Sequence, residues 1–525
     1  MVQSVYEGAT IRKFWLYLAM SLASVTVLGG TSASTASEFS GPAQAPRSPE
    51  ALPVSEASRA PETPPPNVVL LVLDDAAAAD IAYMPNVQTR LVDRGTTFAR
   101  YYSPWPLCCP ARASILTGRY PHNHQVIGNL GPLGGFTAFE DDQTIATWLN
   151  PTYRTGFVGK YFNDYADTAA GRRYVPPGWD SWRASVEPST YAYLHQRLNI
   201  DGTLTRFDGY ATTTFGEMGR EFLESDGESP FFLYQSFVAP HNGGPREPDD
   251  PSIGSPHVEA KYVDTYVGPT VSTDPSFNEA DVSDKPADVR SRPLLSAEQI
   301  AEIGEQTSQR RESLRSVDNQ ISFIINAVKR QGQIDNTYFI LLSDNGFFAG
   351  EHRIATGKHL AYEPAAKVPL IIRGPGIEAG ASFDGLAGHQ DIAPTILDMT
   401  DQSRDPAAPP LDGLSLLGLL DASSGSDRVM LLERAQVDPY SDVRIARTDV
   451  ESDLSTVTWI THGMVTPDGW KYLEYPRTAE VEMYNLNSDP SEETNVADRP
   501  RWAAKQSELR DLLLQYKECR GASCR

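Results

Sequence analysis

The first strong structural signal in the chain is Asn67-Val68-Val69-Leu70-Leu71-Val72-Leu73-Asp74-Asp75, and it fixes the class of fold. Six consecutive apolar residues are typical of a central strand that is buried on both faces of a sheet. Two carboxylates follow directly. Ligands of open α/β sheets gather at the carboxyl ends of the strands, so Asp74 and Asp75 are predicted to bind a metal ion. The alternative is that the acidic pair only caps the next helix.

Similar apolar runs recur at residues 155–159, 231–237, 338–342 and 368–372, and residues 295–330 carry helical spacing. Buried strands that alternate with helices predict an α/β fold, with a large, mainly parallel sheet between layers of helices. We expect a helix over residues 85–98 as well.

Three of these runs are followed by side chains that commonly take part in catalysis or metal binding: Lys160, then His241, then Asp344 with Asn345. A carboxylate beside an amide oxygen suits a hard divalent cation. Each signal has a plainer alternative, because a strand-end lysine is commonly solvated, a lone histidine is commonly structural, and Asp-Asn-Gly forms turns.

The 525 residues exceed what one hydrophobic core usually holds, so we expect either two structural units or one large domain with a subdomain. Residues 67–425 carry the strand and helix alternation. Residues 426–525 change character: short alternating strands near 457–460, 470–475 and 481–486 predict a small antiparallel sheet, followed by a helix at about 500–516. Cys519 and Cys524 are predicted to close a small disulfide loop, although four cysteines allow three pairings.

The N-terminal residues 1–36 have the pattern of a secretory signal peptide, with Arg12 and Lys13 before an apolar run at 14–30. An uncleaved membrane anchor is the alternative. Residues 37–66 are rich in Pro, Ser, Ala and Glu, which predicts a linker without regular structure. We therefore expect a secreted protein without stable membrane insertion after cleavage. The net charge of −23 argues against nucleic-acid binding.

The most specific motif lies at residues 106–124, PLCCPARASILTGRYPHNH. Pro110 biases Cys109 away from the α region, so the thiols of Cys108 and Cys109 are expected at the start of a helix. Helix N-termini favour anions, and Arg112 adds a fixed positive charge. A buried cysteine pair or a redox site is the plainer interpretation.

This motif resembles the modification signature of the type I sulfatases, in which Cys-x-Pro-x-Arg is followed by Leu-Thr-Gly-Arg. The resemblance runs from about residue 67 to 499, and it implies the alkaline-phosphatase-like fold. It implies that Cys108 is oxidised to Cα-formylglycine by a formylglycine-generating enzyme and becomes the nucleophile. Arg112 would orient its hydrated form. Ala111 stands where the family usually has serine.

The same resemblance assigns roles to the strand-end residues. It implies one calcium ion held by Asp74, Asp75, residue 108, Asp344 and Asn345. Lys160 and Lys358 would bind the sulfate, and His241 would lie near the leaving group, with His241 or Lys358 as its proton donor. His352 is expected to support the site rather than bind metal. Phe162 stands where many members have histidine.

The expected reaction is hydrolysis of a sulfate monoester in a sulfated small molecule or glycan. The sequence motif at residues 106–124 most resembles that of the N-acetylglucosamine-6-sulfatases, which points to a 6-O-sulfated glucosamine as substrate. Arylsulfatases share this motif. A phosphodiesterase or phosphonate hydrolase of the same superfamily is one alternative, and a non-enzymatic sulfated-glycan binder is another. Residues 242–296 show little periodicity; they either shape specificity or form a plain surface loop.

Overall fold

The computed structural model describes residues 64–165, 171–225, 227, 229–248, 250–267, 271–421, 427–437 and 457–525. The predicted signal peptide and almost all of the predicted linker lie outside the described residues. Residues 63–525 fall in one compact unit. No helix in the described ranges combines the length and the apolar character needed to cross a membrane.

A ten-stranded sheet dominates the molecule, in the order β10-β2-β9-β8-β1-β7-β3-β4-β5-β6. The strands β8, β1, β7, β3 and β4 are mutually parallel, whereas β9, β5 and β6 run antiparallel to their neighbours. The predicted α/β class with a mainly parallel sheet is confirmed. The strands are β1 (Asn67–Leu73), β2 (Thr96–Tyr102), β3 (Arg154–Gly159), β4 (Ser181–Ser185), β5 (Gln196–Ile200), β6 (Thr203–Phe207), β7 (Phe231–Ser236), β8 (Thr337–Ser343), β9 (Leu370–Arg373) and β10 (Ala381–Gly388).

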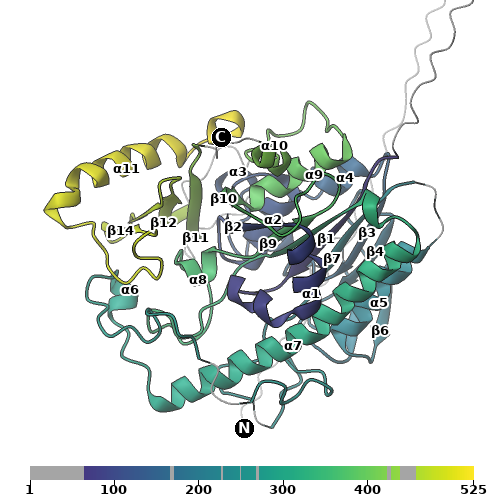
Figure 1. Ribbon diagram of the computed structural model, residues 1–525, viewed down its shortest axis with the longest axis horizontal. Coiled ribbons are helices and arrows are strands. Elements are labelled where there is room, and N and C mark those ends of the chain that lie inside the picture. The colour runs from purple at the N-terminus through teal and green to yellow at the C-terminus, as the bar shows by residue number, and fades with distance from the viewer. Residues whose placement is uncertain are drawn as a thin grey trace, which may run out of the picture. The chain divides into compact units, whose positions relative to one another are not determined.

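Helices cover both faces of this sheet (Figure 1). Val68, Leu70 and Val72 of β1 pack in one core with residues of α2, α4 and α9, while Val69 and Leu71 pack in a second core with residues of α5 and α7. Strand β1 is apolar from Val68 to Leu73 because it is buried on both sides. The helices are α1 (Pro85–Arg90), α2 (Cys108–Thr117), α3 (Pro121–His124), α4 (Ile145–Leu149), α5 (Ala211–Glu224), α6 (Ala287–Arg290), α7 (Ala297–Arg330), α8 (Glu363–Ala366), α9 (Ile392–Thr400), α10 (Leu416–Asp421) and α11 (Ala503–Tyr516).

A second, four-stranded antiparallel sheet follows near the C-terminus, in the order β11-β12-β13-β14 (Figure 1). Leu509 and Leu513 of α11 pack in its core, as does the disulfide Cys519–Cys524, which confirms the predicted pairing. The strands are β11 (Met430–Val437), β12 (Val457–Val465), β13 (Trp470–Tyr475) and β14 (Glu480–Asn485).

The structure differs from the sequence prediction at residues 85–98. Instead of one helix, a short α1 is followed by strand β2. Gly95 separates them and lies against β9, where an added Cβ would be 2.3 Å from the carbonyl oxygen of Ile372. This close approach of two backbones ends the helical segment. Residues 297–330 form the single helix α7, which begins at a capping box between Ser296 and Gln299.

Candidate active site

Four adjacent parallel strands bring the predicted site residues to one edge of the sheet. In the order β8, β1, β7, β3, these strands end at Asp344 and Asn345, at Asp74 and Asp75, shortly before His241, and at Lys160. The carboxyl ends of parallel strands share one edge, so residues far apart in sequence meet there. We call the group formed by Asp74, Asp75, Cys108, Lys160, His241, Asp344, Asn345 and Lys358 the strand-end cluster.

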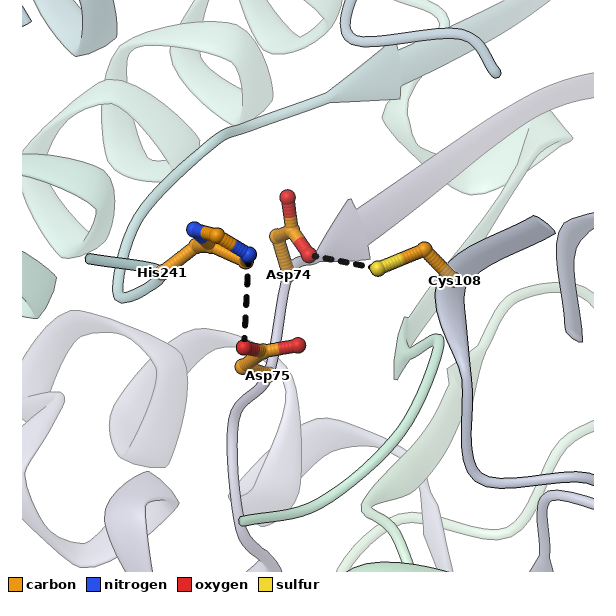
Figure 2. A group of neighbouring side chains, drawn as sticks. All are labelled: Asp74, Asp75, Cys108 and His241. Atoms are coloured by element: carbon orange, nitrogen blue, oxygen red, sulfur yellow. Dashed lines mark hydrogen bonds and ion pairs between the residues drawn. The ribbon is translucent and has the colours of Figure 1, made fainter. Parts of the chain in front are cut away.

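Cys108 is the first residue of α2 and is completely buried. Its Sγ lies 3.8 Å from Asp74 Oδ1 (Figure 2). The same sulfur accepts a hydrogen bond from Lys358 Nζ at 3.2 Å. Burial raises the pKa of the Cys108 thiol, and the ammonium groups of Lys160 and Lys358 partly oppose that rise. Cys109 is also free, but it points away from the cluster and its Sγ contacts Asn163.

The carboxylates of the cluster suit a hard divalent cation, whereas a thiolate and an imidazole are softer ligands. Ligand atoms of Asp74, Asp75, Cys108 and His241 all lie within 4.8 Å of one another. Figure 2 shows Asp74 facing the cysteine and Asp75 facing the histidine. Burial, opposed by Lys160 and reinforced by the neighbouring carboxylates, raises the pKa of Asp74 to about 7. A bound cation would relieve this crowding of carboxylates.

Asp344 and Asn345 complete the acidic side of the cluster. Asn345 Nδ2 donates to Asp75 Oδ1 at 2.7 Å, while its Oδ1 is buried and has no hydrogen-bond partner in the described part of the chain. A buried amide oxygen without a donor is costly unless it meets a cation. Asp75 itself has φ of 71°, a strained backbone value of the kind found at functional sites. The residues present therefore fit an oxygen-coordinated metal such as calcium.

Arg112 joins the ends of three strands. Its Nε donates to Asp344 Oδ2 at 2.9 Å, and its Nη1 donates to the carbonyl of Lys160 and to Ser236 Oγ, both at 2.8 Å. This buried guanidinium fixes Asp344 relative to Lys160. The structure therefore supports a positioning role for Arg112; the predicted orientation of residue 108 by Arg112 stays a prediction.

Two lysines bring positive charge to the acidic group. Lys160 is fully buried and its Nζ lies 2.5 Å from Asp74 Oδ2. Lys358 Nζ contacts both Asp75 Oδ1 and the sulfur of Cys108. The neighbouring carboxylates outweigh burial and raise the pKa of both ammonium groups, which therefore stay charged. An anion that enters the cluster meets two fixed cations.

His241 follows β7 and belongs to the cluster, whereas His352 does not. His241 Nε2 lies 3.7 Å from Asp75 Oδ2, and its Nδ1 pairs with the carbonyl of Asn242 at 2.7 Å. Burial, together with Lys358 and Lys160, lowers the pKa of His241 to about 3 despite the opposing charge of Asp75. His352 Nδ1 pairs with Glu279 Oε2 at 2.7 Å, which agrees with a supporting role.

Residues 276–279, within the predicted stretch 242–296, pack against residues 350–352, which precede Lys358. The backbone N–H of His352 donates to Ser276, that of Asn278 donates to Gly350, and Glu279 holds the His352 ring. The segment is therefore attached to the site region. Phe162, at the position where many relatives have histidine, instead stacks on Phe139 at 4.3 Å in the core.

Sequence reasoning missed Tyr191, which lies between β4 and β5. Its ring stacks on His241 and lies under the ammonium of Lys160. Nothing in the local sequence identifies it, because both partners come from other segments of the chain.

Comparison with known proteins gives one consistent result. The family model described as "Sulfatase" matches residues 66–402. An arylsulfatase of Volvox carteri is 30% identical over 501 residues, covering 87% of this chain and 75% of that protein. A human N-acetylglucosamine-6-sulfatase is 29% identical over 497 residues, covering 88% and 86%.

A similar solved structure is that of a protein in complex with its substrate D-glucosamine-2-N,6-O-disulfate. It superposes with a TM-score of 0.66 at 23% identity and covers 86% of this chain and 98% of that one. At this identity the likeness shows the fold.

Proposed function

The chain belongs to the sulfatase family, with its alkaline-phosphatase-like fold, and is a sulfuric ester hydrolase; from that premise we propose how its site cleaves a sulfate monoester. The observation that carries the proposal is the position of Cys108, whose sulfur lies 3.2 Å from Lys358 Nζ and 3.8 Å from Asp74 Oδ1 at the ends of four parallel strands.

Residue 108 is the nucleophile. Oxidised to Cα-formylglycine and hydrated, it would supply two hydroxyls, one to attack sulfur and one to release the sulfate. Its place at the N-terminus of the ten-residue helix α2 favours the negative charge of an attacking oxygen. This chemistry requires a formylglycine-generating enzyme as a partner during maturation.

Asp74, Asp75, Asp344 and Asn345 would hold one calcium ion, together with residue 108. Calcium would draw charge from the non-bridging oxygens of the sulfate. Lys160 and Lys358 bind the same oxygens and hold the sulfur in line with residue 108, which supplies the positional and electrostatic terms of catalysis. Arg112 fixes the carboxylate of Asp344 relative to the backbone of Lys160 through its hydrogen bonds to both.

His241 or Lys358 gives a proton to the oxygen that leaves. The bond between sulfur and that oxygen breaks, the organic part departs as an alcohol or phenol, and one water is consumed for each inorganic sulfate released. Lys358 keeps its proton, because the pKa of its ammonium group is raised. His241 has its Nε2 facing the cluster while its Nδ1 donates to the carbonyl of Asn242, so it can give a proton from Nε2 only as the imidazolium. A sulfate anion bound beside it would have to raise the low pKa that His241 has in the free site.

The substrate is a 6-O-sulfated N-acetylglucosamine or an aryl sulfate. The names of the human and Volvox relatives support these two classes. The pattern of residues 1–36 supports secretion, so the substrate would be met outside the cell.

The test combines mass spectrometry with turnover. The tryptic peptide 101–112 of active enzyme should carry the mass of an aldehyde at residue 108. Cys108→Ala should abolish sulfate release from 4-nitrophenyl sulfate and N-acetylglucosamine 6-sulfate. The matched variant Cys109→Ala should keep kcat within about threefold, because Cys109 faces Asn163 rather than the cluster.

Three results would contradict the proposal. An unmodified thiol in fully active enzyme removes the nucleophile. Faster turnover of 4-nitrophenyl phosphate or a phenylphosphonate ester than of the sulfate favours the phosphodiesterase or phosphonate hydrolase alternative. Binding of a sulfated glycan without any turnover by correctly modified protein favours the non-enzymatic alternative.

A further inference from the structure

Tyr191 touches two members of the strand-end cluster without belonging to the metal donors. Its ring stacks on the His241 imidazole with centroids 4.3 Å apart and an interplanar angle of 24°. The Nζ of Lys160 lies 4.7 Å from the centroid of the same ring. One side chain thus contacts both a proposed proton donor and a proposed sulfate ligand.

The backbone fixes Tyr191 relative to His241. The N–H of Gly244 donates to the carbonyl of Tyr191 at 3.1 Å, and the N–H of Tyr193 donates back to the carbonyl of Gly244 at 2.7 Å. The hydroxyl of Tyr193 donates to the carbonyl of His241 at 2.7 Å. A Cβ on Gly243 would lie 2.2 Å from the Tyr191 carbonyl oxygen, so the two loops are in close contact.

The hydroxyl of Tyr191 is fixed separately. It accepts from Asn163 Nδ2 at 2.9 Å, and Asn163 in turn contacts the sulfur of Cys109 beside the nucleophile position. The ring is therefore held at both ends, by the loop that carries it and by a residue tied to α2. His241 and Lys160 therefore pack against a ring whose position is set mainly by the backbone contacts between the Tyr191 loop and Gly244.

We propose that Tyr191 is a positioning residue of the sulfatase site, whose ring sets the orientation of His241 toward the leaving group and packs against Lys160. The inference rests on the proposed function, because it assumes that His241 is the proton donor. His241 depends on the ring most, since its other orienting bond, from Nδ1 to Asn242, still allows rotation about that bond. Lys160 is also held by Asp74.

The contact of Tyr191 with His241 predicts that loss of the ring will lower kcat more for a sugar sulfate than for an aryl sulfate. A phenolate leaves readily without a proton, whereas a sugar alkoxide needs one, so misorientation of His241 penalises the sugar sulfate. Tyr191→Leu should lower kcat for N-acetylglucosamine 6-sulfate by about 10- to 100-fold, the loss that a small misplacement causes. Its kcat for 4-nitrophenyl sulfate should fall less than about fivefold, and KM for both should change less than about threefold.

Conservative variants separate the ring from the hydroxyl. Tyr191→Phe keeps the stack and loses the bond from Asn163, so kcat for both substrates should stay within about threefold of wild type. Tyr191→Met fills similar volume without a ring and should reproduce the selective loss, which keeps the test valid if Tyr191→Leu does not fold. Tyr210→Leu alters a neighbouring tyrosine that contacts Tyr193 and serves as the stability control.

The proposal is overturned if both ring-deleting variants lose activity equally on the two substrates, as Tyr210→Leu should, or keep the wild-type ratio of kcat values. It is also overturned if Tyr191→Phe loses as much as Tyr191→Leu. Absence of turnover by correctly modified wild-type enzyme on both sulfates would instead contradict the proposed function, so the two failures are distinguishable.

Discussion

At the scale of single residues, the site depends on backbone geometry as much as on charged groups. Gly159 precedes Lys160 and has φ of 105°, a conformation that favours glycine. A Cβ at this position would lie 1.7 Å from the carbonyl oxygen of Ser236. The lysine can reach Asp74 only because the residue before it has no side chain.

Gly159→Ala should therefore destabilise the protein by about 3 kcal/mol or more, since the backbone must move as well as adopt a strained φ. Urea unfolding measures the change. Gly332→Ala is the matched control: Gly332 also has positive φ, 72°, but nothing lies within 4 Å of its Cβ position. Equal losses in the two variants would show that the contact with Ser236 is unimportant.

Asn345 provides a second prediction at this scale. Asn345→Ala removes the unpaired buried Oδ1 and the bond to Asp75, so calcium should bind at least about tenfold more weakly in isothermal titration calorimetry. In wild type, added calcium should raise Tm, because an ion that binds only the folded state stabilises it. Asn129→Ala, near Cys109 but outside the donor set, should leave the affinity unchanged. Unaltered affinity in Asn345→Ala would remove Asn345 from the proposed ligands.

At the scale of elements, buried apolar runs made five of the ten strands of the large sheet predictable, namely β1, β3, β7, β8 and β9; β2, β4, β5, β6 and β10 were not predicted. Strands β1, β3, β7 and β8 are buried at nearly every position, so each contains a run of apolar residues, and the polar residues that follow the run stand out. Strand β2 was missed because it mixes exposed and buried residues, as in exposed Ala99 beside buried Phe98. Strand β11 was missed because it buries Glu433, whose partner His122 is more than 300 residues away.

The same physics limited prediction of the site. Its metal donors and lysines follow strands or a recognisable motif, so they could be selected from the sequence. Tyr191 lies in an irregular loop, and its contact with His241 exists only because Gly243 and Gly244 let the two loops approach. No pattern in the residues around Tyr191 encodes that approach.

The contact between α3 and β11 predicts a dependence of stability on pH. Burial alone would lower the pKa of His122, but the charge and hydrogen bond of Glu433 and the carbonyl of Cys519 raise it to about 9. Because this value lies above the ordinary 6.5, the stabilisation is fully present below about pH 6.5 and is lost as pH rises to about 9. The full change amounts to about 3 kcal/mol.

Urea unfolding of wild type and His122→Gln at pH 6 and pH 9.5 measures this contribution. The difference in unfolding free energy between the two proteins should be large at pH 6 and should nearly vanish at pH 9.5. A difference that does not depend on pH would mean that the imidazole is uncharged in the folded protein.

At the scale of the whole molecule, the C-terminal sheet shares its core with the region of the large sheet. Tyr102, Tyr120 and Leu386 pack in one cluster with Leu431 and Met464. Sequence composition suggested a division between residues 67–425 and residues 426–525. Because side chains from both parts pack in this cluster, the division separates segments that bury one another. We expect the two to unfold together rather than independently.

A buried ion-pair network connects the C-terminal sheet to the segment that carries Lys358. The fully buried Nζ of Lys471, on β13, lies 2.9 Å from Glu363 Oε1 and 2.7 Å from Glu492 Oε1, and it donates to the carbonyl of Ala361 at 2.9 Å. Ala361 is three residues from Lys358. The C-terminal sheet thus supports a proposed sulfate-binding lysine from outside the large sheet.

Lys471→Met should leave Glu492 buried without its cation and Glu363 with Lys367 alone, at a cost of about 3–5 kcal/mol. Because the cores are continuous, Tm should fall as one transition in calorimetry, and hydrogen exchange should increase in the peptide around Lys358 as well as in β13. Lys505→Met removes a partly exposed ion pair with Asp468 and should cost less than about 1 kcal/mol. Two separate transitions in Lys471→Met, with exchange around Lys358 unchanged, would show that the C-terminal sheet is an independent unit and that Lys358 is held by its own segment alone.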